Sequence, residues 1–589
     1  MKYSDQLADW LVDLGYTHCF FVAGGNIMYL LESCSHRFTC VPVVHEVAAG
    51  MAAEYFNEVA TSGKAFALVT AGPGLTNIVT AIAAAFMESH ELLVIGGQVK
   101  VADLSRGLVR QRGIQEVNGV DIVKPVTVTS TRLTEVIGKQ MFLRIVQSGT
   151  ACRKGPVFVE IPLDLQGRTI DSETFCRSFE PDLVSPPEIS FTVLDDIVCK
   201  LRTAERPVLL LGGGICRFTA SELLTPLAEL GIPLMTTWNG IDRVPSEHPL
   251  YFGRPNTWGQ RSSNVLLQQA DIVLALGTRL GLQQTGFDWQ EFVPLGDVIQ
   301  VDCDPAELAK GHPEVFLPVC GDANAVLRFV AGSARGSYHE WVKFCRMVRQ
   351  EIPLVEPVNS TTEGYLSPFR FMQDLSQICT GKEVVIPCSS GGAYTVFMQA
   401  FDQKAGQRIV STKGMASMGY GLGGAIGAAF AARDKRTILV EGDGGFLQNL
   451  QELGTVSANR LNLKIFLFDN DGYASIRMMQ KNYFAGHLVG CDTETGLGIP
   501  DWQLLFAAYR IPVMPIGIGY QEDEAFLRLF ESETAAAFMV KIDPNQTYFP
   551  KISSRVGPDG KMESNPLHLM SPELPAEVAT KVFRYLHAS

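Results

Sequence analysis

The chain has 589 residues, of which 46% are hydrophobic and 19% are charged, and its formal net charge is −13. A chain of this length exceeds one hydrophobic core and suits roughly three or four domains. The negative charge argues against nucleic acid or an anionic membrane as the main partner. No signal peptide or bilayer-spanning apolar run is visible, and the 13 cysteines form no CxxC pair. We therefore expect a cytoplasmic protein with reduced thiols and no zinc site.

The N-terminal part alternates between helices and strands. Ser4 is expected to cap a first helix that ends at Gly15 and gathers its apolar residues on one face, namely Leu7, Trp10, Leu11 and Leu14. Strands are then expected at 19–22, 65–70, 92–96 and 156–161, with a helix at 75–87. This alternation favours a parallel sheet covered by helices.

Two further parts of the chain repeat this alternation. Stretches near 178–190 and 353–362 are rich in turn-forming residues and are predicted to be linkers. Buried strands are expected at 207–211, 272–276 and 298–302, and again at 384–386, 437–440 and 463–468. The fold class predicted is therefore α/β, with three consecutive doubly wound parallel-sheet domains that suggest duplication of one architecture. Their expected bounds are 1–177, 191–345 and 366–550, followed by a tail, 551–589, to which we assign no fold.

The most informative motif pairs an acid with an amide in the C-terminal part. Asp443 stands between Gly442 and Gly444, directly after a predicted strand, and Asn470 follows the next strand 27 positions further on. The carboxyl ends of neighbouring parallel strands open on the same crevice, where ligands bind. A carboxylate and an amide oxygen suit Mg²⁺, which takes its other ligands from water and phosphates. The pairing predicts a metal-bridged diphosphate.

Glu46 is the first candidate outside this motif. It follows His45 and has apolar residues on both sides, so burial should raise its pKa above about 4.3. That suits an acid that donates a proton to a ring nitrogen in a dry pocket. The alternative is a glutamate at a helix N-terminus that backbone amides satisfy.

The spacing and flanks of Asp443 and Asn470 resemble the thiamine diphosphate (ThDP) signature, and nearly the whole chain is similar to the acetolactate-synthase-like group of that superfamily. The segments that carry the likeness are 45–50, 71–74, 114–116 and 414–419. The resemblance implies a pyrimidine-binding first domain, a central domain of the FAD-binding type and a diphosphate-binding third domain. It also implies a homodimer or homotetramer.

The same resemblance implies roles for individual residues. Glu46 would hydrogen-bond the aminopyrimidine, Gln115 would lie near the substrate, and Met418 would wedge the cofactor into a bent shape. Asp443, Asn470 and the backbone carbonyl of Gly472 would bind Mg²⁺. The alternatives are a surface amide for Gln115 and a core residue for Met418. Further cofactor contacts are expected at Gly25, Asn26, Pro73, Asn77, Ser389, Ser390, Gly391, Ala416, Gly442, Gly444, Gly445, Tyr473 and Ala474. An ordinary strand-to-helix loop is the alternative for residues 389–391.

The central domain has its own candidate ligand. Related enzymes hold a nucleotide at strand ends of this kind, and in acetolactate synthases the ligand is FAD with no redox part. The residues that would contact FAD are Gly212, Gly213, Thr237, Gly277, Arg279, Asp302 and Asp322, together with Arg153. The alternative is that these glycines are purely structural.

Two loops depart from the acetolactate-synthase pattern, and they shape the functional prediction. They are Gly391-Gly392-Ala393-Tyr394 and Asp469-Asn470-Asp471-Gly472-Tyr473. We therefore expect a carboligase that decarboxylates a small 2-keto acid, pyruvate, and passes the two-carbon unit to a carbonyl acceptor. A nucleotide-linked ketosugar is the preferred acceptor, as in the flavin-containing enzymes on the way to yersiniose that this chain also resembles. The alternatives are an acetolactate synthase acting on two 2-keto acids, a simple decarboxylase and a non-catalytic ThDP-binding scaffold.

Overall fold

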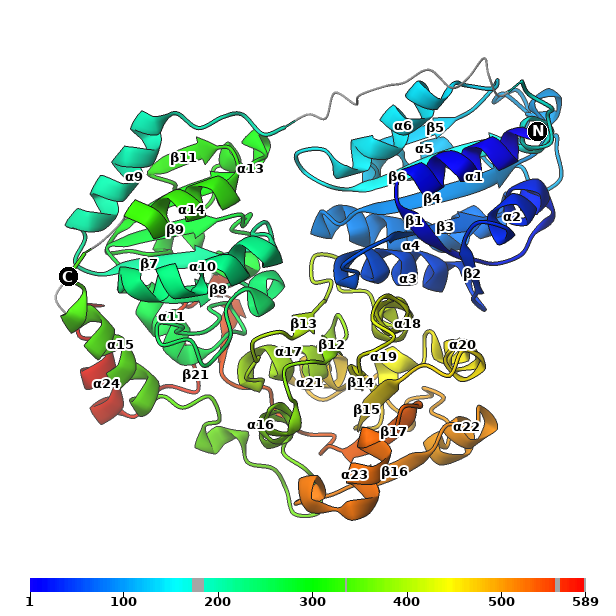
Figure 1. Cartoon of the computed structure of the whole chain (residues 1–589). Helices are drawn as coiled ribbons and strands as arrows, with labels where there is room; N and C mark the ends of the chain where they lie inside the picture. The colour runs from blue at the N-terminus through cyan, green and yellow to red at the C-terminus, as the bar shows by residue number, and fades with distance from the viewer. Residues whose placement is uncertain (172–184, 334–335, 557–561, 587–589) are drawn as a thin grey trace. The chain divides into compact units, whose positions relative to one another are not determined.

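The computed structural model describes residues 1–171, 185–333, 336–556 and 562–586 (Figure 1). The chain forms two compact units. The first unit consists of Met1–Ser185, Glu383–Gly391 and Val410–Lys541, and the second of Pro186–Lys382, Gly392–Ile409 and Ile542–Ser589. Three parallel sheets confirm the predicted α/β fold class, whereas the predicted domain bounds stay predictions. Residues 178–184 of the first expected linker lie outside the described residues.

The N-terminal sheet of the first unit has the strand order β2-β1-β3-β4-β6-β5, with parallel pairing throughout. Its strands are β1 (Tyr16–Phe21), β2 (Thr39–Pro42), β3 (Lys64–Val69), β4 (Leu92–Gln98), β5 (Thr129–Arg132) and β6 (Pro156–Pro162). Its helices are α1 (Tyr3–Asp13), α2 (Met28–Ser35), α3 (Glu46–Val59), α4 (Pro73–Glu88), α5 (Gly119–Val123), α6 (Lys139–Gln147) and α7 (Leu163–Gln166). The order reverses between β1 and β3, and such switch points are where doubly wound sheets bind ligands.

The start of α1 differs from the prediction. The helix begins at Tyr3 with Lys2 as its N-cap, so Ser4 lies inside the first turn. The Asp5 carboxylate accepts the N–H of Lys2 (3.1 Å) and does the capping that we assigned to Ser4. Ser4 is buried instead, and its hydroxyl accepts a hydrogen bond from Ser33 on α2 (2.8 Å).

The second sheet of the first unit repeats this topology. Within the unit its strand order is β12-β14-β15-β17-β16, which matches β1-β3-β4-β6-β5 strand for strand and agrees with the expected duplication. The strands are β12 (Val384–Ile386), β14 (Thr437–Gly442), β15 (Leu463–Asp469), β16 (Val513–Ile516) and β17 (Ala536–Lys541). The helices are α18 (Tyr420–Ala431), α19 (Asp443–Phe446), α20 (Leu453–Ala458), α21 (Ala474–Tyr483), α22 (Trp502–Ala508) and α23 (Glu524–Glu531).

Helices α3 and α18 join the two halves of the first unit. They contribute to one hydrophobic core that also includes strands of both sheets. Small residues let the two backbones approach, since a Cβ atom placed on Gly427 would lie 1.9 Å from the carbonyl oxygen of Ala52. Gly424 likewise faces the ring of Tyr55. The helix that begins at Glu46 therefore lies against the helix that follows the 414–419 segment.

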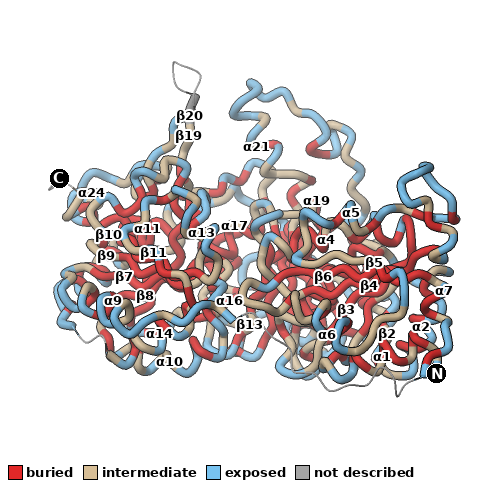
Figure 2. Tube along the Cα trace, turned by 90° about the horizontal axis from the view of Figure 1, so that it is seen from above, coloured by how far each residue is buried: buried red, intermediate tan, exposed pale blue. Residues whose placement is uncertain are grey.

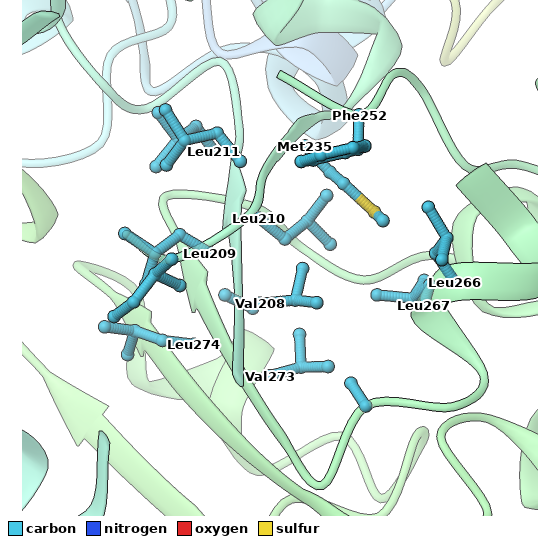
Figure 3. Packing of buried hydrophobic residues seen from close by; sticks show 14 of the residues in the cluster. Val208, Leu209, Leu210, Leu211, Met235, Phe252, Leu266, Leu267, Val273 and Leu274 are labelled. Carbon is cyan, nitrogen blue, oxygen red and sulfur yellow. The ribbon is translucent and has the colours of Figure 1, made fainter. Parts of the chain in front are cut away.

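The second unit is built on the sheet β11-β10-β9-β7-β8, which is also parallel. Its strands are β7 (Pro207–Leu211), β8 (Leu234–Thr236), β9 (Ile272–Leu276), β10 (Asp297–Asp302) and β11 (Leu317–Cys320), and the unit also contains β13 (Arg408–Ile409). Its helices are α9 (Phe191–Thr203), α10 (Arg217–Leu230), α11 (Arg261–Leu267), α12 (Leu282–Thr285), α13 (Pro305–Leu308), α14 (Ala323–Ser333), α15 (His339–Glu351), α16 (Pro368–Ile378) and α17 (Gly391–Ala400). Figure 3 shows the leucine and valine side chains of β7 and β9 in the core. The strand order reverses at β7 and β9.

The C-terminal tail packs on the core of the second unit. Strand β18 (Lys551–Ile552) pairs antiparallel with β21 (Met570–Ser571), and β19 (Ser554–Val556) pairs with β20 (Met562–Ser564) before α24 (Ala576–Val582). Ile552, Leu567, Met570 and Val582 belong to the buried cluster of this unit. Figure 2 shows the sheet strands as buried and the outer turns of the helices as exposed. Among the helices of the described residues, none is long and apolar enough to span a membrane.

Candidate functional site

Asp443 lies at the carboxyl end of β14, as the sequence predicted, and is the first residue of α19. Its side chain is fully buried. Oδ1 accepts the N–H of Gly444 (2.7 Å), and Oδ2 accepts the N–H groups of Asn470 and Gly472 (both 3.0 Å). Burial raises the pKa of Asp443 to about 7 although these N–H groups lower it. The carboxylate therefore sits in a site with three backbone donors.

The side-chain amide of Asn470 lies beside the Asp443 carboxylate. Its terminal atom that faces the carboxylate lies 3.1 Å from Asp443 Oδ1 and 3.0 Å from the carbonyl oxygen of Gly472. If this atom is the amide oxygen, it faces two other oxygens, an arrangement that a bound cation would stabilise. If it is the amide nitrogen, it donates a hydrogen bond to each of them. Among the described residues no three His, Cys, Asp or Glu side chains are placed to hold a metal ion. One carboxylate with neutral oxygens is the donor set that suits Mg²⁺.

Arg477 holds the loop after β15 in place. Its side chain is buried, and it donates to the carbonyl oxygens of Asn470 (3.1 Å) and Asp471 and to Asp492 Oδ2 (3.2 Å). Gly472 has φ 108°, a conformation that favours glycine. Sequence reasoning missed the Arg477–Asp492 pair, because no local pattern marks a salt bridge across this loop.

The glycines around Asp443 face different surroundings. A Cβ atom on Gly444 would lie 2.5 Å from the ring of Tyr473, so these two predicted contacts touch each other. A Cβ on Gly445 would lie 2.8 Å from Glu441 Oε1, whereas one on Gly442 would meet no atom within 4 Å. Ala474 begins α21 directly after Tyr473. The backbone at Gly442 thus borders open space beside the carboxylate.

The loop after β12 meets the segment that carries Met418. The Ser389 hydroxyl donates to the carbonyl oxygen of Ser417. Gly391 and Ala416 both have positive φ, at 76° and 52°, and a Cβ on Gly391 would meet no atom within 4 Å. Ser390 and Met418 are both half-buried. The structure therefore brings together two segments that the sequence assigned to the cofactor separately.

Glu46 is the first residue of α3 and is 8% exposed. Its Oε2 accepts a hydrogen bond from the side-chain amide of Asn77 on α4 (2.9 Å). Pro73 occupies the first turn of α4, where its fixed φ suits a helix start. The side chain that donates to Glu46 is thus one that the sequence analysis had also selected.

Four other predicted residues of the first unit lie in loops or in a short turn. Gln115 is exposed with φ 63°, and a Cβ on Gly72 would lie 2.6 Å from the Gln115 carbonyl oxygen. Asn26 lies with Gly25 in the 3₁₀ turn η1 (Gly25–Ile27), and its carbonyl accepts from Gln166 Nε2 (2.8 Å). Arg153 Nε donates to Ser89 Oγ (3.0 Å).

Glu54 forms a buried polar cluster on the same helix as Glu46. Its Oε1 lies 2.7 Å from His90 Nδ1, and its Oε2 accepts the hydroxyl of Tyr420 at the start of α18. Burial opposes a charge on His90, but the carboxylates of Glu58, Glu54 and Glu88 outweigh it and raise the pKa of His90 to about 9. The sequence did not mark this cluster, because its members come from three distant segments.

The glycines of the second unit lie at its topological switch point. Gly212 and Gly214 follow β7 and Gly277 follows β9; a Cβ on Gly212 would lie 2.2 Å from the Gly277 carbonyl oxygen. The close packing of the two turns is a structural reason for glycine at these positions. Their location at the ends of β7 and β9 also suits a ligand-binding crevice. The other expected contacts have partners within the unit. Thr237 is the N-cap residue of η5 (Trp238–Arg243), and its carbonyl accepts the N–H of Gly240 (3.0 Å). The Arg279 carbonyl accepts from Lys310, Asp302 Oδ1 accepts from the Asp304 N–H, and Asp322 Oδ1 accepts from Asn324.

Comparison with known proteins identifies the class that this fold and site define. The family descriptions that match are "Thiamine pyrophosphate enzyme, N-terminal TPP binding domain" over residues 1–122, the central domain over 194–330 and the C-terminal TPP binding domain over 390–540. These matches follow the chain in the order of the three sheets.

Comparison with individual relatives narrows the class of ThDP-dependent enzyme to which the chain belongs. The chain is 31% identical over 481 residues to the probable acetolactate synthase large subunit of Methanocaldococcus jannaschii, covering 79% of each chain. It is 28% identical over 542 residues to the acetolactate synthase isozyme 1 large subunit of Escherichia coli, covering 90% of this chain and 92% of that one. The isozyme 2 large subunit of the same organism is 28% identical over 578 residues, covering 96% and 100%. The chain belongs to the acetolactate-synthase-like family of ThDP-dependent enzymes, which form carbon–carbon bonds.

The Glu54–His90 pair predicts a pH-dependent stability. A histidine whose pKa rises from 6.5 to about 9 on folding adds stability that is fully present below pH 6.5 and disappears as the pH rises through 9. We expect His90→Gln to lower the free energy of unfolding by about 2 kcal/mol at pH 6 and to have little effect above pH 9. Denaturant unfolding of both proteins across this range measures the difference. His36→Gln, at an exposed histidine that also faces a glutamate, is the control. A pH-independent loss in His90→Gln contradicts the assignment.

Proposed function

We propose that the chain is an acetolactate synthase, which joins the two-carbon unit of pyruvate to a second 2-keto acid. The observation that carries this proposal is the similarity to acetolactate synthase large subunits over about nine-tenths of both chains. These relatives support our alternative acceptor, a 2-keto acid, better than the preferred nucleotide-linked ketosugar. The ketosugar stays a second candidate because of the two loops, 391–394 and 469–473, that depart from the acetolactate-synthase pattern.

The site residues have complementary tasks in this proposal. Bound ThDP would accept the electron pair released by decarboxylation and return it to the acceptor carbonyl in the new carbon–carbon bond. Glu46, held by Asn77 (2.9 Å), holds a proton at the pyrimidine ring nitrogen, and its low exposure keeps that proton from water. Met418 supports the cofactor against its apolar side chain. Gln115 orients the substrate.

The diphosphate end of the cofactor is held by the edge of the second sheet of the first unit. Asp443, Asn470 and the Gly472 carbonyl bind Mg²⁺, and backbone N–H groups of the 389–391 loop bind the phosphate oxygens. The open space at Gly442 and Gly391 leaves room for phosphates to approach the backbone. The family resemblance implies that each ThDP lies between the first domain of one subunit and the third domain of another, so the remaining predicted contacts, from Gly25 to Ala474, would be shared between two cofactors of an oligomer.

Product analysis tests the proposed reaction. The purified protein is incubated with ThDP, Mg²⁺ and pyruvate alone, then with added 2-oxobutyrate, then with an added nucleotide-linked ketosugar, and the products are identified by mass. We expect acetolactate from pyruvate alone and its homologue from 2-oxobutyrate. Glu46→Gln should lower turnover by roughly 10²-fold or more without unfolding, because the proton at the ring nitrogen is lost. Acetaldehyde alone, or an adduct formed only with the ketosugar, contradicts the proposal.

Mg²⁺ affinity tests the metal assignment. A proton and the cation compete for Asp443, whose pKa of about 7 lies near neutrality. The Mg²⁺ concentration needed for half-maximal ThDP binding should therefore rise about tenfold for each pH unit below 7 and level off above it. Asp443→Asn should bind Mg²⁺ weakly at every pH, and Asp434→Asn, at an exposed carboxylate outside the ligand set, should keep the wild-type profile. Titrations that follow protein fluorescence give these values. A wild-type profile that is flat from pH 6 to 8 is the contrary result.

We also propose that the second unit binds FAD without redox use, at the β7/β9 switch point. The relatives' family and the position of Gly212, Gly213 and Gly277 support this ligand. The visible spectrum of the purified protein should show flavin absorption, and Gly213→Val should abolish it, because the added side chain fills the space above the turn. If the purified protein shows no flavin absorption, and none appears after incubation with FAD, the assignment is wrong.

We propose a homodimer or homotetramer as the active form, following the family resemblance. Several relatives are named as large subunits. A second, smaller chain is therefore a further proposed partner.

A further inference from the structure

We infer that Glu452 is the positioning residue for Glu46: its carboxylate fixes the turn from which Glu46 enters the site. This inference rests on the role proposed above for Glu46. Glu452 ends the 3₁₀ turn η8 (Leu450–Glu452), on the other half of the first unit from Glu46. Its side chain is fully buried.

The contacts of Glu452 are directed at the two residues that precede Glu46. Oε1 accepts the N–H of Val44 (3.0 Å) and the N–H of His45 (2.9 Å). Oε2 accepts the hydroxyl of Thr455 (2.7 Å) and lies 3.3 Å from the Val44 nitrogen. A carboxylate that receives two backbone N–H groups and a hydroxyl defines both the position and the direction of this turn.

The start of α3 needs such an acceptor. His45 is the N-cap of the helix, and its own ring nitrogen Nδ1 accepts only the N–H of Val47 (3.2 Å). The N–H groups of Val44 and His45 precede the helix and have no acceptor inside it. A negative charge at the N-terminus of a 14-residue helix is also favoured by the helix dipole. The chain therefore places a buried acid where the backbone requires one.

The same short segment carries the proposed metal ligand. Asp443 begins α19, and η8 follows α19 directly before α20. The Asp443 and Glu452 carboxylates are thus carried by one stretch of chain between β14 and α20.

Two variants separate the effect of the carboxylate oxygen from that of its charge. Glu452→Ala removes both acceptor oxygens, so the amide protons of Val44 and His45 should exchange at least about tenfold faster in the cofactor-free protein, as measured on peptides by mass spectrometry. Glu452→Gln keeps one oxygen for both N–H groups and should stay within about threefold of the wild type. Unchanged protection in Glu452→Ala overturns the contact.

The consequence for Glu46 is read from the cofactor itself. At saturating ThDP and Mg²⁺, Glu452→Ala should slow deuterium exchange at the C2 carbon of ThDP by at least about tenfold, since small displacements of a catalytic group cost this much. Glu452→Gln should restore most of the rate. If exchange at C2 is unchanged in Glu452→Ala while the turn is loosened, the positioning role is wrong.

Two controls keep these outcomes distinct. Glu383→Ala removes another buried glutamate of the first unit, one whose side chain faces Arg436 at 3.9 Å, and should leave C2 exchange unchanged. Glu46→Gln should slow C2 exchange in any case; if it does not, the proposed role of Glu46 fails, not the turn contact. If Glu452→Ala does not fold, Thr455→Val serves instead. This variant should slow C2 exchange by about threefold. An unchanged rate of C2 exchange in Thr455→Val overturns the inference.

Discussion

A buried carboxylate that receives three backbone N–H groups is the constraint on which the candidate site depends. Asp443 ties the end of β14 to the loop after β15 through Asn470 and Gly472. Removing an ionised carboxylate from water is costly unless charge or hydrogen bonds compensate, and the raised pKa of Asp443 expresses that cost. In the proposed metal site, a divalent cation held by this carboxylate, the amide of Asn470 and the carbonyl of Gly472 would offset that cost. The folded chain thus holds at one sheet edge an unfavourable negative charge that a bound cation would neutralise.

The repeated topology of the first unit determines what can lie near that edge. Both sheets end their central strands at a switch point, and α3 packs against α18 so closely that only glycine fits at position 427. The helix that begins at Glu46 and the helix that follows Met418 are therefore held at backbone contact distance. Small residues allow the two helices to pack at this short distance. The hydrogen bonds of Glu54 and Glu452 fix how the two halves are oriented. Apolar packing therefore sets the distance between the two halves, and the polar contacts set their orientation.

Much of the fold was predictable because it is local in the sequence. Strands β7, β9 and β12 begin and end where expected, since apolar runs between turn-forming residues define them. The positions of Asp443 and Asn470 followed from strand ends in the same way. Contacts that join distant residues could not be predicted: Glu452 binds a turn 408 positions earlier, and Tyr420 reaches Glu54 across 366 positions. Ser4 failed as a cap because a competing acid, Asp5, stands one residue further on. The roles of the site residues are still predictions.

The buried acids between the two halves of the first unit show why a hydrophobic contact alone would not fix their relative orientation. Apolar helices can slide or rotate over one another at small cost, since dispersion and burial have little directionality. Glu54 and Glu452 each demand specific partners, and an altered register would leave a carboxylate without hydrogen bonds. Such groups make alternative arrangements of the two halves energetically expensive. A reaction that depends on where one proton is held needs this kind of specificity more than it needs further stability. The polar contacts around α3 are accordingly best understood as determinants of the position of Glu46.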